Sequence, residues 1–153
     1  MITYNSGSIF DSLAQTLVNP VNTVGVMGRG LAATFKRLYP EMYRQYRYLC
    51  LQGKLNIGDL YIYSCPFGTS DDIIVNFPTK RHWRDPSQVE YLDAGLRKFV
   101  RQYALYGISS VSFPMLGCGC GGLDWEIQVQ PVMEHYLQNL PIPVYIHVFS
   151  GGN

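Results

Sequence analysis

The stretch "NPVNTVGVMGRGLAATF", residues 19–35, runs from an apolar strand through a glycine-rich turn into a helix. The residues at 13–22 have a short apolar core that ends in Asn and Pro, which is typical of a strand that runs into a loop. After the glycines, apolar residues return at helical spacing until Pro40 interrupts the helix and Gly53 ends it. A strand, a glycine turn and a helix in succession are the unit from which α/β folds are built.

The rest of the chain continues this alternation. Helix 87–107 is predicted to start at Ser87 as its cap and to end at Gly107, and helix 126–140 to be interrupted near Pro131. We therefore expect an α/β domain in which helices cover both faces of a central sheet. The further strand-like runs are 59–66, 72–78, 108–116 and 143–150.

Composition limits the function classes. A chain of 153 residues that is 47% hydrophobic forms one domain with a real core, and its net charge of +1 provides no overall basic field, so any contact with nucleic acid must be local. The sequence shows neither a signal-peptide pattern nor an apolar run near the about 20 residues of a membrane span. We expect a cytoplasmic protein with reduced thiols and no membrane partner.

Cys118 and Cys120 form a CxC pair that lacks the further ligands that a zinc site needs. We interpret them as small residues of a tight loop, and we expect no metal and no other cofactor.

Two glycine-rich loops, at 25–31 and 114–125, each follow a strand and precede a helix. Backbone amides at a helix start suit phosphate, and the carboxyl ends of strands meet at one sheet edge, so the two loops should face each other and bind a diphosphate between them. A plain turn is the alternative for the first loop. Asn22 is a candidate ligand for sugar hydroxyls, whereas Asn19 is interpreted as a structural turn cap.

The order of "VNTVGVMGRGLA", "FPTKRHWRDPS" and "LGCGCGGLDW" resembles the macrodomain family over essentially the whole chain. Within it, these motifs look most like the DNA ADP-ribosyl glycohydrolase macrodomains of DarT–DarG toxin–antitoxin pairs, and they are similar to the terminal-ADP-ribose glycohydrolases. The resemblance implies a three-layer α/β/α sandwich with a mixed central sheet, formed by residues 1–153 as one monomeric macrodomain. In the resembled antitoxins a toxin-binding segment follows the macrodomain, so this chain fits a domain excised from a longer one.

By the same resemblance, the partners are ADP-ribose, ADP-ribosylated single-stranded DNA and a cognate ADP-ribosyltransferase toxin. The first glycine loop is expected to face the diphosphate and distal ribose, and the second to wrap them from the other side. Phe149 matches an aromatic beside the adenine, with core filling as its alternative role. The ADP-ribose-binding residues so implied are Ser8, Ile9, Asn22, Gly28, Arg29, Gly30, Leu31, Thr79, Leu116, Gly117, Cys118, Gly119, Cys120, Gly121 and Phe149.

Lys80 is the catalytic candidate that the resemblance implies, in a hydrolase that removes ADP-ribose from a DNA base by cleaving an N-glycosidic bond. As a neutral amine it would attack C1″ or its ring-opened aldehyde and form a Schiff base. As a cation it would instead stabilise departing oxygen or phosphate. The alternative is that Lys80 has no catalytic role and is a solvated charge at a strand end.

The sequence departs from the family pattern at two positions. Many macrodomains carry Gly-Asp near the start, where this chain has Gly7-Ser8. Related glycohydrolases carry an Asp in the second loop where this chain has Gly121. Asp124 comes three residues later, and we expect it to cap the following helix rather than to catalyse.

The loop after Lys80 offers contacts for DNA. His82, Trp83 and Arg84, together with Asn22, are candidate base or DNA contacts, with Arg81 as a further phosphate contact. The alternative is a loop pinned by Trp83 with exposed arginines. Two other functions remain: a reader that binds ADP-ribose without turnover, and a hydrolase of ADP-ribosyl-glutamate or O-acetyl-ADP-ribose. His135 and His147 are assigned no chemistry.

Overall fold

The computed structural model describes residues 1–65 and 72–148. The helices and strands follow the order expected from the sequence, except that the first strand and a short 3₁₀ turn after it were not expected. In chain order the elements are β1 (Ile2–Asn5), η1 (Ile9–Asp11), β2 (Thr16–Asn22), α1 (Gly30–Leu38), α2 (Pro40–Leu51), β3 (Tyr61–Ser64), β4 (Ile73–Lys80), α3 (Val89–Gln102), η2 (Tyr103–Tyr106), β5 (Val111–Phe113), η3 (Trp125–Val129), α4 (Gln130–Leu137) and β6 (Val144–His147).

The strands form one six-stranded sheet in the order β1-β6-β5-β2-β4-β3. All neighbouring pairs are parallel except β3 and β4, which are antiparallel, so the predicted mixed sheet is confirmed. β2 and β4 are the longest paired strands and lie side by side. Their carboxyl ends reach the same edge of the sheet.

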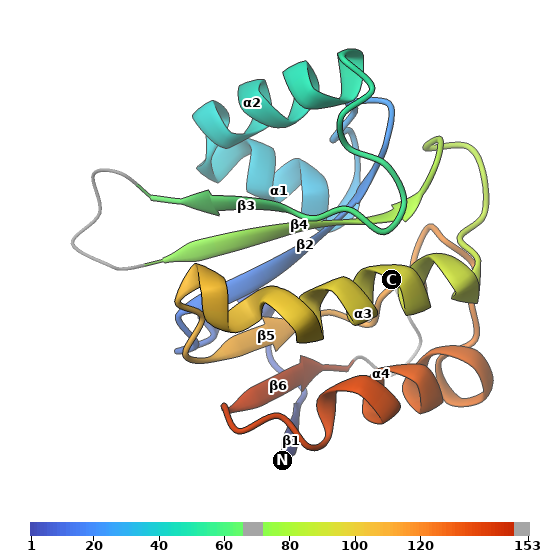
Figure 1. The fold of residues 1–153 in the computed structure, drawn as a ribbon. Coiled ribbons are helices and arrows are strands. Elements are labelled where there is room, and N and C mark those ends of the chain that lie inside the picture. Colours follow the sequence, from blue (N-terminus) through green and yellow to red (C-terminus); the bar gives the residue numbers. More distant parts are fainter. Residues whose placement is uncertain (66–71, 149–153) are drawn as a thin grey trace.

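Helices cover both faces of the sheet, as Figure 1 shows, and the three-layer α/β/α prediction is confirmed. The core on one face joins α3 and α4 to β4, β5 and β6, and the core on the other face joins α1 and α2 to β2, β3 and β4. Burial of these apolar side chains is the main favourable contribution to folding. In the described part of the chain, no helix has the length and apolarity to span a membrane.

Close packing of α3 on β4 depends on a glycine. A Cβ added at Gly95 would lie 2.3 Å from Cζ of Phe77, whose ring is fully buried. Only a residue without a side chain lets the helix approach the strand this closely. The carboxyl end of β4 is thereby fixed from the α3 side.

The strand and helix boundaries differ from those expected at several prolines and caps. β2 includes Pro20 and β4 includes Pro78, where we expected the strands to end. At both prolines the strand has a partner on one side only, and a proline is tolerated there. The Ser87 cap was wrong: α3 starts after Gln88, and the Ser87 amide instead donates to the Gly121 carbonyl at 2.9 Å.

Two other helix ends agree with the sequence. Gly107 follows η2 in the left-handed conformation, with φ of 72°, which glycine adopts without strain. The irregularity near Pro131 is a π-helical turn, η3, after which α4 begins with Pro131 in its first turn.

Candidate functional site

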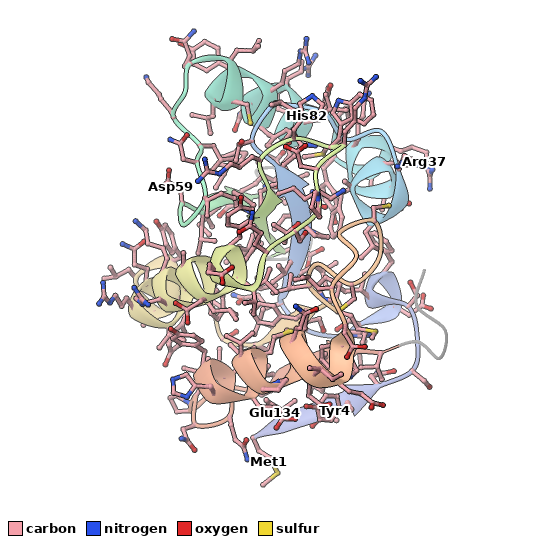
Figure 2. The ribbon with its side chains drawn as sticks, turned by 90° about the vertical axis from the view of Figure 1, so that its right-hand side faces the viewer. Met1, Tyr4, Arg37, Asp59, His82 and Glu134 are labelled. Atoms are coloured by element: carbon pink, nitrogen blue, oxygen red, sulfur yellow. The ribbon has the colours of Figure 1, made fainter. Side chains whose placement is uncertain are left out.

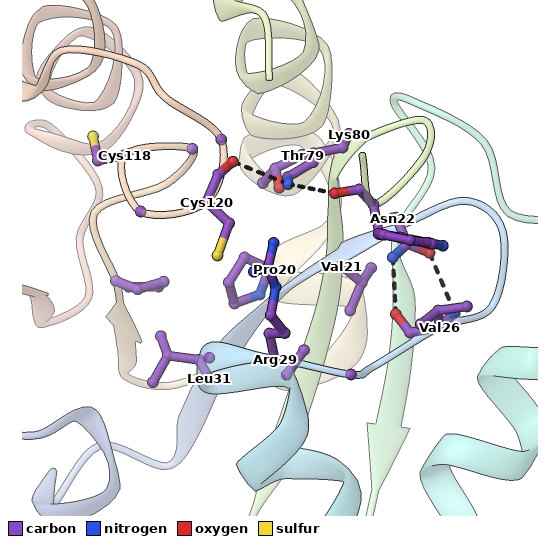
Figure 3. A pocket seen from close by; sticks show the side chains of 18 of the residues that line it. Pro20, Val21, Asn22, Val26, Arg29, Leu31, Thr79, Lys80, Cys118 and Cys120 are labelled. Carbon is purple, nitrogen blue, oxygen red and sulfur yellow. Dashed lines mark hydrogen bonds between the residues drawn. The ribbon is translucent and has the colours of Figure 1, made fainter. Parts of the chain in front are cut away.

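A cavity of about 500 Å³ opens at the carboxyl ends of β2 and β4 and at the loop after β5 (Figure 3). Both glycine loops line it, as expected from their positions after strands. The lining residues are Pro20, Val21, Asn22, Val26, Gly28, Arg29, Gly30, Leu31, Ala32, Thr79, Lys80, Trp83, Pro114, Met115, Gly117, Cys118, Gly119, Cys120 and Gly121. The volume is in the range of pockets that hold small organic ligands.

The first wall is the start of α1. Arg29 is the N-cap and makes no side-chain capping bond, and Gly30 begins the helix with φ of 60°. The amides of the first turn therefore remain available at the cavity, together with the positive end of the helix dipole. This geometry suits an anion such as a phosphate group.

Asn22 lines the cavity, but most hydrogen bonds of its side-chain amide are made within the protein. Its Oδ1 accepts hydrogen bonds from the Val24 amide at 3.1 Å, the Val26 amide at 3.3 Å and the Tyr46 hydroxyl at 2.8 Å. Its Nδ2 donates to the Val26 carbonyl at 2.8 Å, as Figure 3 shows, which leaves one Nδ2 hydrogen for a ligand. Asn22 thus sets the shape of the loop that forms the cavity wall, and its predicted ribose contact stays a prediction.

Asn19 is not the turn cap that we expected. It lies inside β2, fully buried, and its Nδ2 donates to Oδ1 of Asn76 at 3.0 Å and contacts Sδ of Met27 at 3.8 Å. The continuation of β2 through Pro20 places Asn19 between the two long strands instead of at a turn.

The second wall is the loop of Gly117 to Gly121. A Cβ at Gly121 would lie 2.3 Å from Oγ of Ser87 and 2.5 Å from the Gly117 carbonyl oxygen. An aspartate at this position is excluded by the packing of the loop on Ser87. The packing therefore explains why this chain has Gly121 where related glycohydrolases carry an Asp.

The two cysteines of this loop differ. Figure 3 shows the Cys120 thiol pointing toward Pro20 and Arg29, whereas the Cys118 thiol points away. Burial, and secondarily the charge of Asp124, raises the pKa of Cys118 to about 11. All four cysteines are free, and the described residues contain no cluster of three metal-ligating side chains.

Lys80 is the last residue of β4 and lines the cavity. The register between β2 and β4 shifts at this point: Val21 pairs with Pro78, and Asn22 pairs with Lys80, so Thr79 is an extra residue. Such irregularities redirect side chains and are frequent next to active sites. Lys80 thereby lies opposite Asn22 at the cavity edge.

The Lys80 ammonium is held rather than free in solvent. Its Nζ donates to the carbonyl oxygens of Trp83 and Cys120, each at 3.1 Å. Lys80 is thus half-buried at the strand end and is hydrogen-bonded to the backbone of two loops. The ammonium bridges the loop after β4 and the second glycine loop.

The loop after Lys80 forms the cavity rim. Trp83 lines the cavity and is 40% exposed, and the guanidinium carbon of Arg84 lies 4.6 Å from the centre of its ring. The His82 ring packs against the Trp83 ring, with 5.1 Å between the ring centres. Arg81 instead packs over Tyr91 at 5.5 Å, away from Lys80. His82 and Arg84 themselves are not among the cavity residues.

Three predicted binding residues lie outside the cavity, and a fourth lies outside the described residues. Ser8 caps η1 by accepting from the Phe10 amide, and Ile9 and Leu116 are buried in the protein interior. Phe149 belongs to the residues that the structure does not describe.

Asp124 caps η3, as expected, by accepting from the Ile127 amide at 2.7 Å. Both ring nitrogens of His147 lie 3.0 Å from protein oxygens, on Gly7 and Ser112, which agrees with a structural role.

Sequence reasoning missed the apolar part of the cavity. No polar or glycine signal marks these positions, because apolar residues at strand ends look like core residues in the sequence. The missed residues are Pro20, Val21, Val26, Ala32, Pro114 and Met115.

Comparison with known proteins shows the family of the chain. The family model "Macro domain" matches residues 18–132. The chain is 43% identical, over all of its 153 residues, to a "DNA ADP-ribosyl glycohydrolase" of Mycobacterium tuberculosis, of which it covers 44%. It is 38% identical over 147 residues to a protein of the same name from Thermus aquaticus, covering 95% of this chain and 41% of that protein. The chain thus spans about two fifths of the length of these relatives.

Solved structures are similar over nearly the whole chain. The "Macrodomain of Mycobacterium tuberculosis DarG" matches with a TM-score of 0.91 and 44% identity, over 96% of this chain and 97% of that one. "Thermosipho africanus DarTG in complex with ADP-ribose" matches with a TM-score of 0.90 and 40% identity, over 95% of this chain and 41% of that one. The chain therefore belongs to the macro domain family.

Proposed function

We propose that this domain is an ADP-ribosyl glycohydrolase that removes ADP-ribose from the bases of single-stranded DNA and so acts as the catalytic part of an antitoxin. The observation that carries the proposal is the position of the Lys80 ammonium, held by the Trp83 and Cys120 carbonyls at the edge of a cavity with two glycine walls. The names of the relatives, which include a transferase–glycohydrolase fusion protein, support the same substrate and a cognate transferase toxin as partner.

ADP-ribose fits the cavity as a diphosphate between the two walls. The first-turn amides of α1 and the side chain of Arg29 would face the phosphates from one side. The backbone of Gly117 to Gly121 would face them from the other. The distal ribose would then lie near Asn22 and Lys80, which are paired across β2 and β4.

We assign Lys80 the role of a cation in this reaction. The bond from C1″ to the base nitrogen breaks, its electron pair goes to the nitrogen, and water supplies hydroxide to C1″ and a proton to the nitrogen. A held ammonium stabilises the negative charge that develops on the departing base. The two carbonyl contacts hold the Lys80 nitrogen at the cavity edge, where a cation would lie close to the departing base.

The rim provides a place for the base. Trp83 is 40% exposed beside Lys80, and stacking of a base on such an aromatic ring stabilises bound single strands by about 1–3 kcal/mol per base. Arg84 and His82 pack around the same ring and would contact the adjoining nucleotide. Free thiols fit a reducing compartment such as the cytoplasm.

A specific observation favours a second function. Among the described residues, none of those that line the cavity is an Asp or Glu, so no carboxylate is placed there to act as a general base. A reader that binds ADP-ribose without turnover would have this composition. Turnover on an ADP-ribosylated oligonucleotide decides between the two.

The test compares wild type with Lys80→Ala on an ADP-ribosylated single-stranded oligonucleotide and on an ADP-ribosyl-glutamate peptide, with released ADP-ribose as the readout. We expect release from the oligonucleotide by wild type and at least about a hundredfold loss in Lys80→Ala. Lys98→Ala, on α3 and outside the cavity, is the matched control. Tight ADP-ribose binding in calorimetry without release from either substrate would establish the reader instead.

A further inference from the structure

The small net charge of the chain conceals a strong separation of charge. Residues 29–54 and 80–84 contain nine of the twelve Lys and Arg residues but one of the eleven Asp and Glu residues. The remaining segments contain ten of the acidic residues. Residues 29–54 and 80–84 therefore form a positive part, whereas the acidic residues are spread over the other segments. The other three cations, Arg97, Lys98 and Arg101, lie on α3.

The positive part adjoins the cavity. We define the basic surface as the exposed cations Lys36, Arg37, Arg44 and Arg47 of α1 and α2, with Arg81 and Arg84 of the loop after β4. Figure 2 shows Arg37 and His82 toward the same end of the molecule, with Glu134 at the opposite end.

The loop at residues 23–26 connects the two parts of the basic surface. On one side, the Thr23 amide and hydroxyl donate to the Arg81 carbonyl at 3.2 and 2.8 Å. On the other, the Gly25 carbonyl accepts from Arg47 at 3.3 Å and from the Tyr43 hydroxyl at 3.4 Å. Lys36 lies 4.4 Å above the Tyr43 ring. One loop thus separates Lys36 and Arg47 from the rim of the cavity.

We infer that the basic surface binds the phosphates of the single-stranded nucleic acid that flanks the modified base. The strand leaves the cavity at Trp83, crosses the loop at residues 23–26 and continues over α2. The inference rests on the proposed function, because it assumes that a modified base occupies the cavity.

Two features favour a nucleic acid over an acidic protein as the occupant. Contacts lead from the cavity mouth, where Arg84 packs on Trp83, through the loop at residues 23–26 to Arg47, and the phosphates of a strand attached to the bound base would run away from the cavity in the same way. The path also begins at an exposed aromatic ring, Trp83, with Arg84 stacked on it, a combination that suits single strands. An acidic protein surface needs neither the aromatic ring nor continuity with the cavity.

The experiment compares Lys36→Gln/Arg47→Gln with Lys98→Gln/Arg101→Gln, which removes the same charge from α3. Fluorescence anisotropy measures binding of an unmodified single-stranded oligonucleotide over a range of KCl concentrations. We expect the first pair to bind several-fold more weakly and to lower the slope of log affinity against log salt by about 1.4, since each phosphate contact on a single strand accounts for about 0.7. The second pair should bind as wild type does.

Calorimetry with ADP-ribose is the control for the cavity. Both pairs should keep the wild-type affinity, because Tyr43 still holds the Gly25 carbonyl when Arg47 is replaced. Equal weakening of oligonucleotide binding in both pairs, unchanged binding in the first pair, or no binding by wild type would each overturn the inference. Unchanged binding would leave an acidic protein partner as the occupant of this surface.

Two substrates separate this inference from the proposed function. An ADP-ribosylated nucleoside lacks flanking phosphates, whereas an ADP-ribosylated oligonucleotide has them. The Lys36→Gln/Arg47→Gln pair should raise KM several-fold for the oligonucleotide and leave the nucleoside unaffected. If wild type releases ADP-ribose from neither, the proposed function fails, while the anisotropy measurement still decides whether the surface binds nucleic acid.

Discussion

The Lys80 Nζ lies 3.1 Å from the carbonyl oxygen of Cys120, so the end of β4 is hydrogen-bonded to the second glycine loop. The same ammonium donates to the Trp83 carbonyl on the opposite side. One cation therefore connects two loops of the cavity. Substitution of Lys80 removes loop contacts together with a charge, and variants must separate these two effects.

Lys80→Met and Lys80→Arg separate them. Met keeps the length of the side chain but lacks charge and donors, so it should lower single-turnover release of ADP-ribose from a modified oligonucleotide by roughly 10²–10³-fold. Arg keeps charge and donors and should retain a measurable part of the activity. Calorimetry with ADP-ribose checks that both variants still bind.

A different outcome would identify a nucleophile. If Lys80→Arg is as inactive as Lys80→Met, and borohydride added during turnover attaches ADP-ribose to Lys80 in wild type, then the Schiff-base route is correct. The cation role would in that case be wrong.

Gly121→Ala should distort the second glycine loop, because its Cβ would lie 2.3 Å from Oγ of Ser87. We expect a loss of roughly 1–3 kcal/mol in the free energy of unfolding, together with weaker ADP-ribose binding. Denaturant unfolding and calorimetry measure the two effects. Gly28→Ala is the control for stability, since its Cβ would meet a side chain at an ordinary 3.6 Å. Equal stability of the two variants would contradict the packing that excludes an acid here.

Gly95→Ala should reverse the usual effect of alanine in a helix. Alanine normally stabilises a helix interior by about 1 kcal/mol relative to glycine. Here its Cβ would overlap the Phe77 ring, and we expect a net destabilisation of roughly 1–3 kcal/mol in thermal or denaturant unfolding. In a Phe77→Leu background, Gly95→Ala should lower the free energy of unfolding by less than it does in wild type. If the effects of the two substitutions in this double-mutant cycle simply add, the two residues do not interact.

Asp124→Asn should keep the cap of η3 and leave the activity unchanged, whereas Asp124→Ala should lose about 1 kcal/mol of stability. The same substitution tests the Cys118 thiol. Its pKa is about 11, and the charge of Asp124 is the second cause after burial, so Asp124→Asn should lower this pKa. The thiolate is the reactive form, so alkylation of Cys118 at pH 9 should become faster.

Peptide mapping by mass spectrometry follows that alkylation in a Cys120→Ser background. In the parent, alkylation of Cys118 should rise steadily as the pH approaches 11. Loss of ADP-ribose release in Asp124→Asn would instead give Asp124 a catalytic role.

The sequence was sufficient for the fold because its periodicity and its glycines agree with each other. The strand–glycine–helix succession at 19–35 predicts where the cavity wall lies, and β2, the loop and α1 occupy these residues. The ends of the strands were less certain, because a proline is compatible with a strand that has a partner on one side. Pro20 and Pro78 are such cases, and sequence alone does not show which strands are neighbours.

Side-chain partners were the least predictable part of the site. The amide of Asn22 was expected to face a ligand, but three hydrogen bonds to its Oδ1 come from the loop and from Tyr46, which is far away in the sequence. Ser87 was expected to cap a helix, but it packs against Gly121 across the fold. Such contacts depend on tertiary packing, which local patterns do not encode.

The extra residue Thr79 in β4 places Lys80 within the paired sheet, opposite Asn22, whereas Trp83 and its neighbours lie in the connection beyond it. In the proposed reaction, the group that acts on the sugar is thus anchored in the scaffold, and the group that meets the base is carried by a segment whose sequence the sheet does not constrain. If the proposed function is correct, preference for the base and cleavage of the bond to the sugar should therefore be separable by substitution. Exchanging residues 81–86 alone should be enough to alter which modified nucleotide is accepted.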